Sequence, residues 1–131
     1  LDAGHHLVIL YPIPSVGWNL PQEFLRRFKN ADAQISIDEL KVNPITTSYE
    51  VYKQRTQSSF DLFDSVTHQN IHRVYPHQLF CDLAIKARCV THDTEHLYYY
   101  DDDHPSVKGA EMITSLLVDA VAIAGAELRS Q

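Results

Sequence analysis

An apolar run from His6 to Tyr11 opens the chain and is broken at once by Pro12 and Pro14. A run without polar alternation is typical of a strand that is buried on both faces of a parallel sheet. The prolines predict that this strand feeds a loop.

Loops at the carboxyl ends of strands hold the active sites of open α/β sheets. The residues that follow the prolines are therefore candidates for lining a substrate cleft, namely Ser15, Trp18 and Asn19. In the alternative interpretation, Trp18 covers the core beneath the loop.

Two further strand candidates, Ile71 to Tyr75 and Leu97 to Tyr100, are separated from the first by segments with helical spacing. Helices between strands indicate parallel pairing through crossover connections. The chain has 131 residues, of which 44% are hydrophobic, so we expect one domain over residues 1–131 with an α/β fold and parallel strands.

Three segments place their apolar residues at helical intervals. They are a short amphipathic segment that begins at Pro21 with Phe24, Leu25 and Phe28 on one side, a segment with a capping box from Thr47 to Glu50 that runs to about Thr67, and an apolar segment from Met112 to Ala126. The segment from Ile35 to Val42 alternates imperfectly and is predicted to be a short strand or an extended connection. The apolar segment is shorter than the roughly 20 residues that span a bilayer, so we expect it to pack on the core.

The acidic stretch from Asp101 to Ser106 precedes the apolar helix. An aspartate three residues before a histidine can turn back, so that the carboxylate of Asp101 accepts the Nδ1 proton of His104. That contact leaves Nε2 of the imidazole free to take a proton from a nucleophile.

Two other interpretations of this stretch remain open. Acidic turns are common before helices, because carboxylates favour the positive end of the helix dipole and Pro105 suits a first helical position. Adjacent aspartates can also bind a hard cation, although the alternation of a calcium-binding loop is missing. We rank a metal below catalysis.

The stretch Tyr-Tyr-Asp-Asp-Asp-His-Pro-Ser, followed by Lys108, Gly109 and Ala110, resembles the last motif of the SGNH (GDSL-type) hydrolases. In that superfamily this motif closes a Ser-His-Asp triad, and its spacing matches Asp101 and His104. The resemblance implies the C-terminal part of a three-layer α/β/α, flavodoxin-like sandwich.

The chain is also similar to one branch of that superfamily, the domains fused to integral membrane O-acyltransferases that modify surface polysaccharides. The strand that ends in the proline-rich turn, Leu7 to Pro14, and the pair Cys81 and Cys89 carry this similarity. It implies an acylated donor, a glycan acceptor, no cofactor, and an N-terminal remainder with a membrane acyltransferase domain. A secreted SGNH esterase is the near alternative.

The chain departs from the superfamily at the nucleophile. It has no Gly-Asp-Ser and no Asn-Asp, and its one Asp-Ser pair, Asp64 and Ser65, falls in a helical pattern. We therefore expect a C-terminal fragment of a larger protein, an incomplete domain that lacks the nucleophile block and is inactive alone.

The two cysteines, Cys81 and Cys89, are too far apart for a Cys-x-x-Cys redox or zinc motif and close enough to form a small disulfide loop. A disulfide fits an oxidising compartment. The alternative is two buried thiols. Together with the resemblance, the pair favours the periplasmic face of the bacterial inner membrane, with the fragment itself soluble.

A net charge of −6 without a basic run argues against a nucleic-acid partner. Histidines recur at intervals of four or five residues, but the patterns around them favour surface positions over a metal site. These histidines are His68, His72, His77, His92 and His96.

A different class of function, a non-catalytic carbohydrate-binding module, would use Trp18 and the tyrosines from Tyr98 to Tyr100 to stack on sugars. Strand alternation would place only part of that tyrosine run on one face.

Overall fold

Two parallel strands form the middle of the fold, which the computed structural model describes for residues 1 and 3–130. Along the chain the elements are β1 (Leu7–Leu10), α1 (Leu20–Phe28), α2 (Ala33–Val42), β2 (Thr46–Ser48), α3 (Tyr49–Ser65), β3 (Ile71–Val74), the 3-10 helix η1 (Pro76–Leu79), β4 (Arg88–Val90) and α4 (Val107–Ser130).

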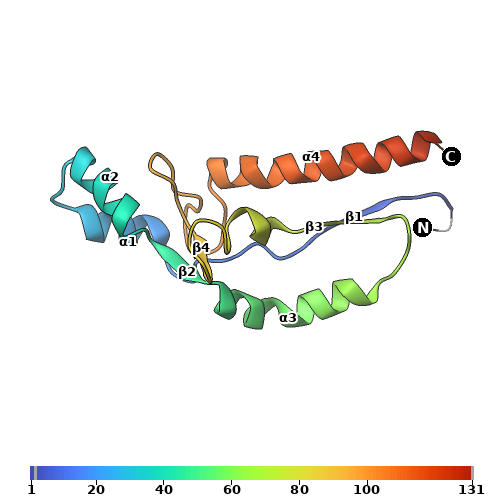
Figure 1. Ribbon diagram of the computed structural model, residues 1–131, viewed down its shortest axis with the longest axis horizontal. Helices are drawn as coiled ribbons and strands as arrows, with labels where there is room; N and C mark the ends of the chain where they lie inside the picture. Colours follow the sequence, from blue (N-terminus) through green and yellow to red (C-terminus); the bar gives the residue numbers. More distant parts are fainter. Residues whose placement is uncertain (2, 131) are drawn as a thin grey trace.

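β1 and β3 pair in parallel, with Leu7 opposite Ile71 and Leu10 opposite Val74. The crossover that a parallel pair needs contains α1, α2, β2 and α3. Figure 1 shows α4 on one side of the strands and α3 on the other, which gives three layers. The predicted α/β fold with parallel strands is confirmed.

A second sheet pairs β2 with β4 in antiparallel register, with Thr47 opposite Cys89. Cys89 forms a disulfide with Cys81, with an S–S distance of 2.02 Å. The loop that this bond closes is held by the N–H of Ala87, which donates to the Asp82 carboxylate at 2.7 Å.

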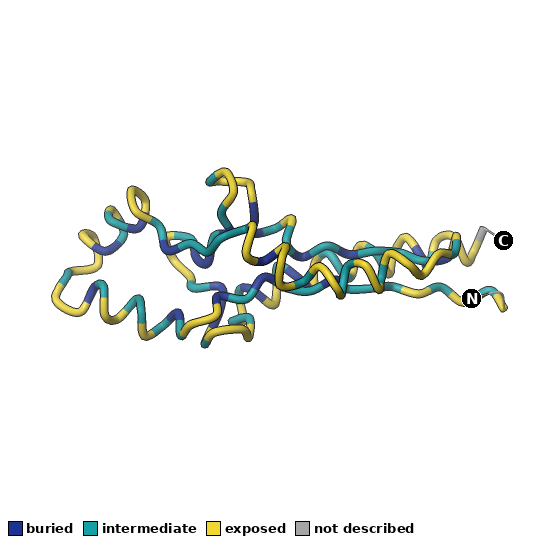
Figure 2. Tube along the Cα trace, turned by 90° about the horizontal axis from the view of Figure 1, so that it is seen from below, coloured by how far each residue is buried: buried dark blue, intermediate teal, exposed yellow. Residues whose placement is uncertain are grey.

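The core gathers where the loop after β1, η1 and the start of α4 meet. Leu20 and Phe80 are among its most enclosed members, at 0% and 1% exposed. Figure 2 shows that the end of the molecule with both termini is mostly half-buried or exposed. The other buried hydrophobic members of this cluster are Val16, Phe28, Leu40, Ile45, Cys81, Cys89, Tyr98, Tyr99 and Ile113.

The prediction of a strand or extended connection from Ile35 to Val42 is wrong, because this segment belongs to helix α2. The Asp32 carboxylate caps the helix by accepting from the Ile35 N–H at 2.8 Å. Ser36 and Leu40, four residues apart, are its buried residues. The cap and this spacing favour a helix.

The prediction of a strand from Leu97 to Tyr100 is also wrong. Its main-chain groups bond to loops, since the Tyr98 N–H donates to Thr91 and the Tyr100 N–H donates to His104. Tyr98 and Tyr99 are both buried, so the alternation expected of a strand does not hold. Asp101 therefore follows an irregular segment.

Helix α4 is longer than predicted and packs on the core along one face only. Ile113 and Ala124 are buried, whereas Val118 and Val121 are 59% and 58% exposed. By length and composition its 23 residues Val107–Arg129 are apolar enough to cross a membrane, which corrects the expectation that no segment of the chain is.

Helix α1 follows its predicted apolar face only in part. Phe28 is buried as expected, whereas Leu25 is 65% exposed.

Candidate functional site

The Asp101 carboxylate is held by the backbone of the turn that it begins. Its Oδ1 accepts from the N–H groups of His104 at 2.8 Å and Asp103 at 3.0 Å. These two donors, His104 first, stabilise the ionised form and hold the pKa of Asp101 below its ordinary value. The other oxygen, Oδ2, lies 2.9 Å from Nδ1 of the His104 imidazole.

A second carboxylate also reaches the histidine, because Oδ1 of Asp103 lies 2.8 Å from the same Nδ1. The hydrogen bond to Asp101 and the negative charges of both aspartates raise the pKa of His104 above its ordinary value. The ring stacks on Tyr100 with centroids 5.4 Å apart, and the histidine side chain is 62% exposed. With Nδ1 engaged, Nε2 is the nitrogen that can exchange a proton with another group.

The turn is anchored to the start of α4 through Ser106. Its N–H donates to the Tyr98 carbonyl at 2.8 Å, and its hydroxyl donates to the Leu97 carbonyl at 2.7 Å. The same hydroxyl accepts from the Gly109 N–H at 3.2 Å and so caps the helix. A Cβ at residue 109 would lie 2.2 Å from the Tyr98 carbonyl oxygen, so only glycine fits there.

The loop after β1 lies against this turn. The N–H groups of Val16 and Gly17 both donate to the Asp102 carbonyl at 2.9 Å, and the Leu20 N–H donates to the Asp101 carbonyl at 3.3 Å. The loop after β1 and the start of α1 are thereby joined to the turn that carries the predicted pair through main-chain bonds.

The three predicted cleft residues occupy different settings. Ser15 and Trp18 line a hollow of about 310 Å³, to which β2, α3 and β4 also contribute residues. Trp18 is 38% exposed, so more than half of its side chain is still covered. Asn19 caps α1, with its side chain accepting from the Gln22 N–H at 2.9 Å, and does not line this hollow.

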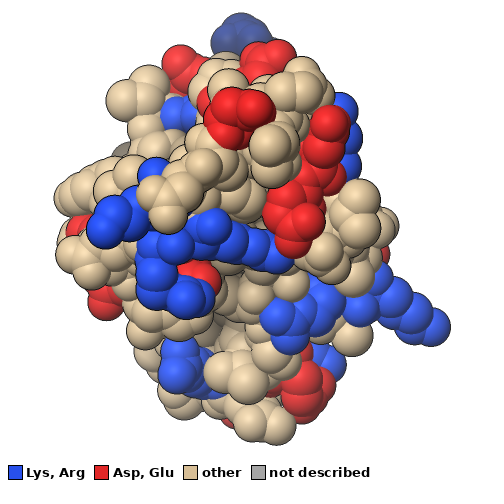
Figure 3. All heavy atoms as spheres, turned by 90° about the vertical axis from the view of Figure 1, so that its left-hand side faces the viewer, with Lys and Arg blue, Asp and Glu red and all other residues tan. Residues whose placement is uncertain are grey.

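Two arginines that the sequence did not single out, Arg55 and Arg88, line the same hollow. Arg88 donates to the hydroxyl and the carbonyl of Thr46 at 2.9 and 2.7 Å, which fixes its guanidinium. Figure 3 shows Lys and Arg side chains gathered at the end of the molecule that carries α1, α2 and β2. Neither arginine carries a local sequence signal, because Arg55 lies in α3 and Arg88 lies in β4. They reach one hollow because α3 directly follows β2, and β2 pairs with β4.

Three histidines predicted at the surface lie at least partly inside. His92 is 8% exposed and accepts from the Ile45 N–H at 2.9 Å. His77 packs among aromatic rings near α3, and burial lowers its pKa. The side chain of His72 is 13% exposed and lies 2.8 Å from His6.

The one Asp-Ser pair lies at the end of α3, outside any strand-to-helix turn. The Ser65 hydroxyl donates to the Leu62 carbonyl at 2.7 Å, and Asp64 faces Arg73 at 3.9 Å. Ser65 is therefore not in the setting of a nucleophile. Within the described residues, the predicted contact between Asp101 and His104 forms, and Asp103 is an additional carboxylate at the same nitrogen that the sequence pattern did not favour.

A family model described as an SGNH domain (fused to AT3 domains) matches residues 1–119. Comparisons with curated proteins and with solved structures found no match.

Proposed function

The chain belongs to the family of SGNH domains fused to AT3 (acyltransferase-3) domains, and on that basis we propose that it serves O-acyl transfer to a cell-surface polysaccharide. Family membership supports an acyltransferase-associated domain. The observation that carries the finer proposal is the 2.9 Å contact between Asp101 and Nδ1 of His104, which leaves Nε2 for chemistry.

In the proposed mechanism, His104 acts as general base and then as general acid. Nε2 takes the proton of a serine hydroxyl as its oxygen attacks the acyl carbonyl, and returns it to the leaving group as the acyl-serine forms. In the second half, Nε2 takes the proton of a sugar hydroxyl, whose oxygen attacks the acyl-serine, and returns that proton to the serine. Asp101 orients the ring and stabilises the imidazolium.

We place the nucleophilic serine outside residues 1–131, because the chain has no Gly-Asp-Ser and Ser65 is engaged at the end of α3. Residues 1–131 would then be an incomplete SGNH domain. On this proposal, the chain alone hydrolyses no simple acetyl ester.

The partner in the same protein is proposed to be a membrane acyltransferase domain, since the family is defined by its fusion to AT3 domains. The disulfide between Cys81 and Cys89 supports an oxidising compartment, for which the periplasmic face of the bacterial inner membrane is our choice. The hollow lined by Trp18, Arg55 and Arg88 is the proposed acceptor subsite, because an exposed indole can stack on a sugar ring.

The test is glycan acylation by the full-length protein that carries this chain. We expect His104→Ala to abolish acyl transfer and Asp101→Asn to reduce it by about 10²–10⁴-fold, the range of general acid-base contributions. His96→Ala is the matched control, because His96 is an exposed histidine 3.3 Å from the Asp93 carboxylate. Full acylation by the His104 variant would refute the mechanism.

The purified chain gives a separate test of where the serine lies. Ester hydrolysis by residues 1–131 that is lost in His104→Ala would place the nucleophile within them and refute that part of the proposal.

A carbohydrate-binding module is the second candidate, favoured by the exposed Trp18 beside the hollow. Of the three tyrosines from Tyr98 to Tyr100 that such a module would use to stack on sugars, Tyr98 and Tyr99 are buried and only Tyr100 is exposed. Glycan binding that survives both Asp101→Asn and His104→Ala, in a protein without acyl transfer, would favour the module.

A further inference from the structure

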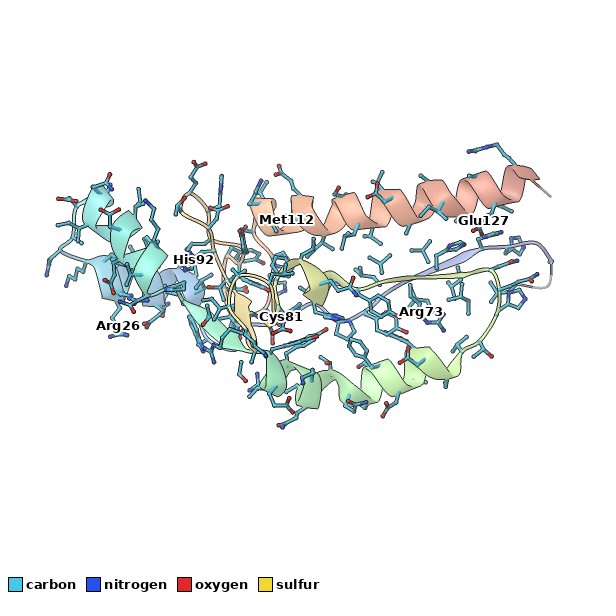
Figure 4. The ribbon with its side chains drawn as sticks, in the orientation of Figure 1. Arg26, Arg73, Cys81, His92, Met112 and Glu127 are labelled. Carbon is cyan, nitrogen blue, oxygen red and sulfur yellow. A yellow bond between two sulfur atoms is a disulfide. The ribbon has the colours of Figure 1, made fainter. Side chains whose placement is uncertain are left out.

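Three side chains that bind metals in other proteins converge at the amino edge of the β1–β3 sheet. His6 precedes β1, His72 lies in β3, and Glu127 lies near the end of α4. Nδ1 of His6 and Nε2 of His72 are 2.8 Å apart, and Oε2 of Glu127 lies 3.7 and 3.5 Å from them. Figure 4 shows Glu127 on the side of α4 that faces the sheet.

The two imidazoles are enclosed, since the side chains of His6 and His72 are 4% and 13% exposed. A neutral pair can share one proton between the facing nitrogens, but within the described chain Nε2 of His6 is buried and has no hydrogen-bond partner. Either tautomer therefore leaves one buried polar atom unsatisfied, which costs about 1–3 kcal/mol. Nε2 of His6 stays without a partner whether or not an ion binds at Nδ1, so this atom does not favour either state. What points to a ligand is the enclosure of two facing imidazole nitrogens beside a carboxylate.

We propose that His6, His72 and Glu127 bind a divalent transition-metal ion of the Zn²⁺ class. Two imidazole nitrogens and a carboxylate oxygen are ligands that zinc takes, and the three ligand atoms lie within 4.8 Å of one another. Nitrogen ligands disfavour Mg²⁺ and Ca²⁺, which prefer oxygen. Glu127 is half exposed, so water can complete the coordination on its side.

The rearrangement needed is small. Ligands about 2.0–2.1 Å from a tetrahedral ion are about 3.3–3.4 Å apart, so the two nitrogens must separate by about half an ångström. The carboxylate is already near that distance from His72.

The site is separate from the Asp101 and His104 turn. The turn contacts the loop after the carboxyl end of β1, whereas His6 lies before the amino end of that strand. The ion would tie the last turns of α4 to the sheet, a structural role that does not depend on the proposed acyl transfer.

The test is titration of the metal-free 131-residue chain with Zn²⁺ against a chromophoric chelator. We expect one tight equivalent, weakened at least about tenfold by His72→Ala and by Glu127→Gln. Two variants serve as controls and should keep one tight equivalent of Zn²⁺. His96→Ala removes an exposed histidine beside a carboxylate, and His104→Ala removes the histidine of the separate group with Asp101 and Asp103.

Circular dichroism establishes that each variant is folded, and Glu127→Gln decides the question if His72→Ala unfolds, because its side chain is half exposed. Zn²⁺ should also raise the thermal midpoint of the wild-type chain and leave that of Glu127→Gln nearly unchanged. The proposal is overturned if the wild-type chain binds no tight equivalent, if Glu127→Gln binds as tightly as wild type, or if the controls weaken equally.

Discussion

Gly109 sits in the first turn of α4, where the helix comes closest to the segment that leads into the Asp101 turn. A Cβ at this residue would lie 2.2 Å from the carbonyl oxygen of Tyr98 and 3.2 Å from its carbonyl carbon. Carbon and carbonyl oxygen normally approach to about 3.3 Å, so Gly109→Ala requires a displacement of about 1 Å. Both partners are backbone, and no side-chain rotation can relieve the overlap.

The expected cost follows from these contacts. Overpacking in a rigid setting costs about 1–3 kcal/mol, and the upper end applies because the Tyr98 carbonyl also accepts from Ser106. Alanine regains about 1 kcal/mol of helix propensity over glycine. We therefore expect Gly109→Ala to lower the free energy of unfolding by about 2 kcal/mol.

Urea unfolding followed by circular dichroism measures this change. With a slope of about 2 kcal/mol per molar urea, the midpoint should fall by about 1 M. Gly125→Ala is the matched control in the same helix, since its Cβ would meet only the Arg129 guanidinium at 3.7 Å. That variant should gain about 0.5–1 kcal/mol. Equal midpoints for the two variants would refute the reasoning.

The remaining predictions concern the turn and the disulfide. The His104 pKa, followed by NMR, should lie above its ordinary value and fall toward it in Asp101→Asn; an unchanged value would contradict the assigned contact. Because the pKa of His104 is raised in the folded state, its contribution to stability is complete below about pH 6.5 and is lost as the pH rises through the His104 pKa of the folded protein. Because the pKa of Asp101 is lowered, its contribution is present above about pH 4 and is lost as the pH falls through the Asp101 pKa of the folded protein. The difference in urea midpoint between wild type and Asp101→Asn should therefore be largest between these limits, and a flat difference would contradict it. Replacing Cys81 and Cys89 by serine should cost about 2.5 kcal/mol for so short a loop, again measured by urea unfolding; no change would contradict a stabilising bond.

Local signals explain which elements were predictable from the sequence. The strand at Leu7–Leu10 and the helix at Tyr49–Ser65 carry local boundary signals, prolines in one case and the predicted capping box from Thr47 to Glu50 in the other. In the structure the cap is Ser48, one residue later than the box predicts. Helix α2 was missed because its signal is one capping aspartate, Asp32, and two buried residues. The Leu97–Tyr100 segment has strand-like residues but finds its hydrogen bonds in loops, which depends on the tertiary fold.

The same distinction applies to the sites. Asp101 and His104 lie three residues apart, so one turn of backbone brings them into contact and the spacing alone predicts it. His6 and His72 are separated by 66 residues, and only the parallel register of β1 with β3 places them together. No local pattern could have paired them.

The bonds that hold the loop after β1 against the Asp101 turn run from main chain to main chain. Such bonds do not depend on which side chain the donor residue carries, except where proline removes the N–H or where the backbone favours glycine, as at Gly17 with its φ of 80°. Exposed positions of this loop, Trp18 among them, can therefore change in evolution while the Asp101 turn keeps its place. The hollow beside Trp18 can thus vary by point substitution while the contact between Asp101 and His104 is retained.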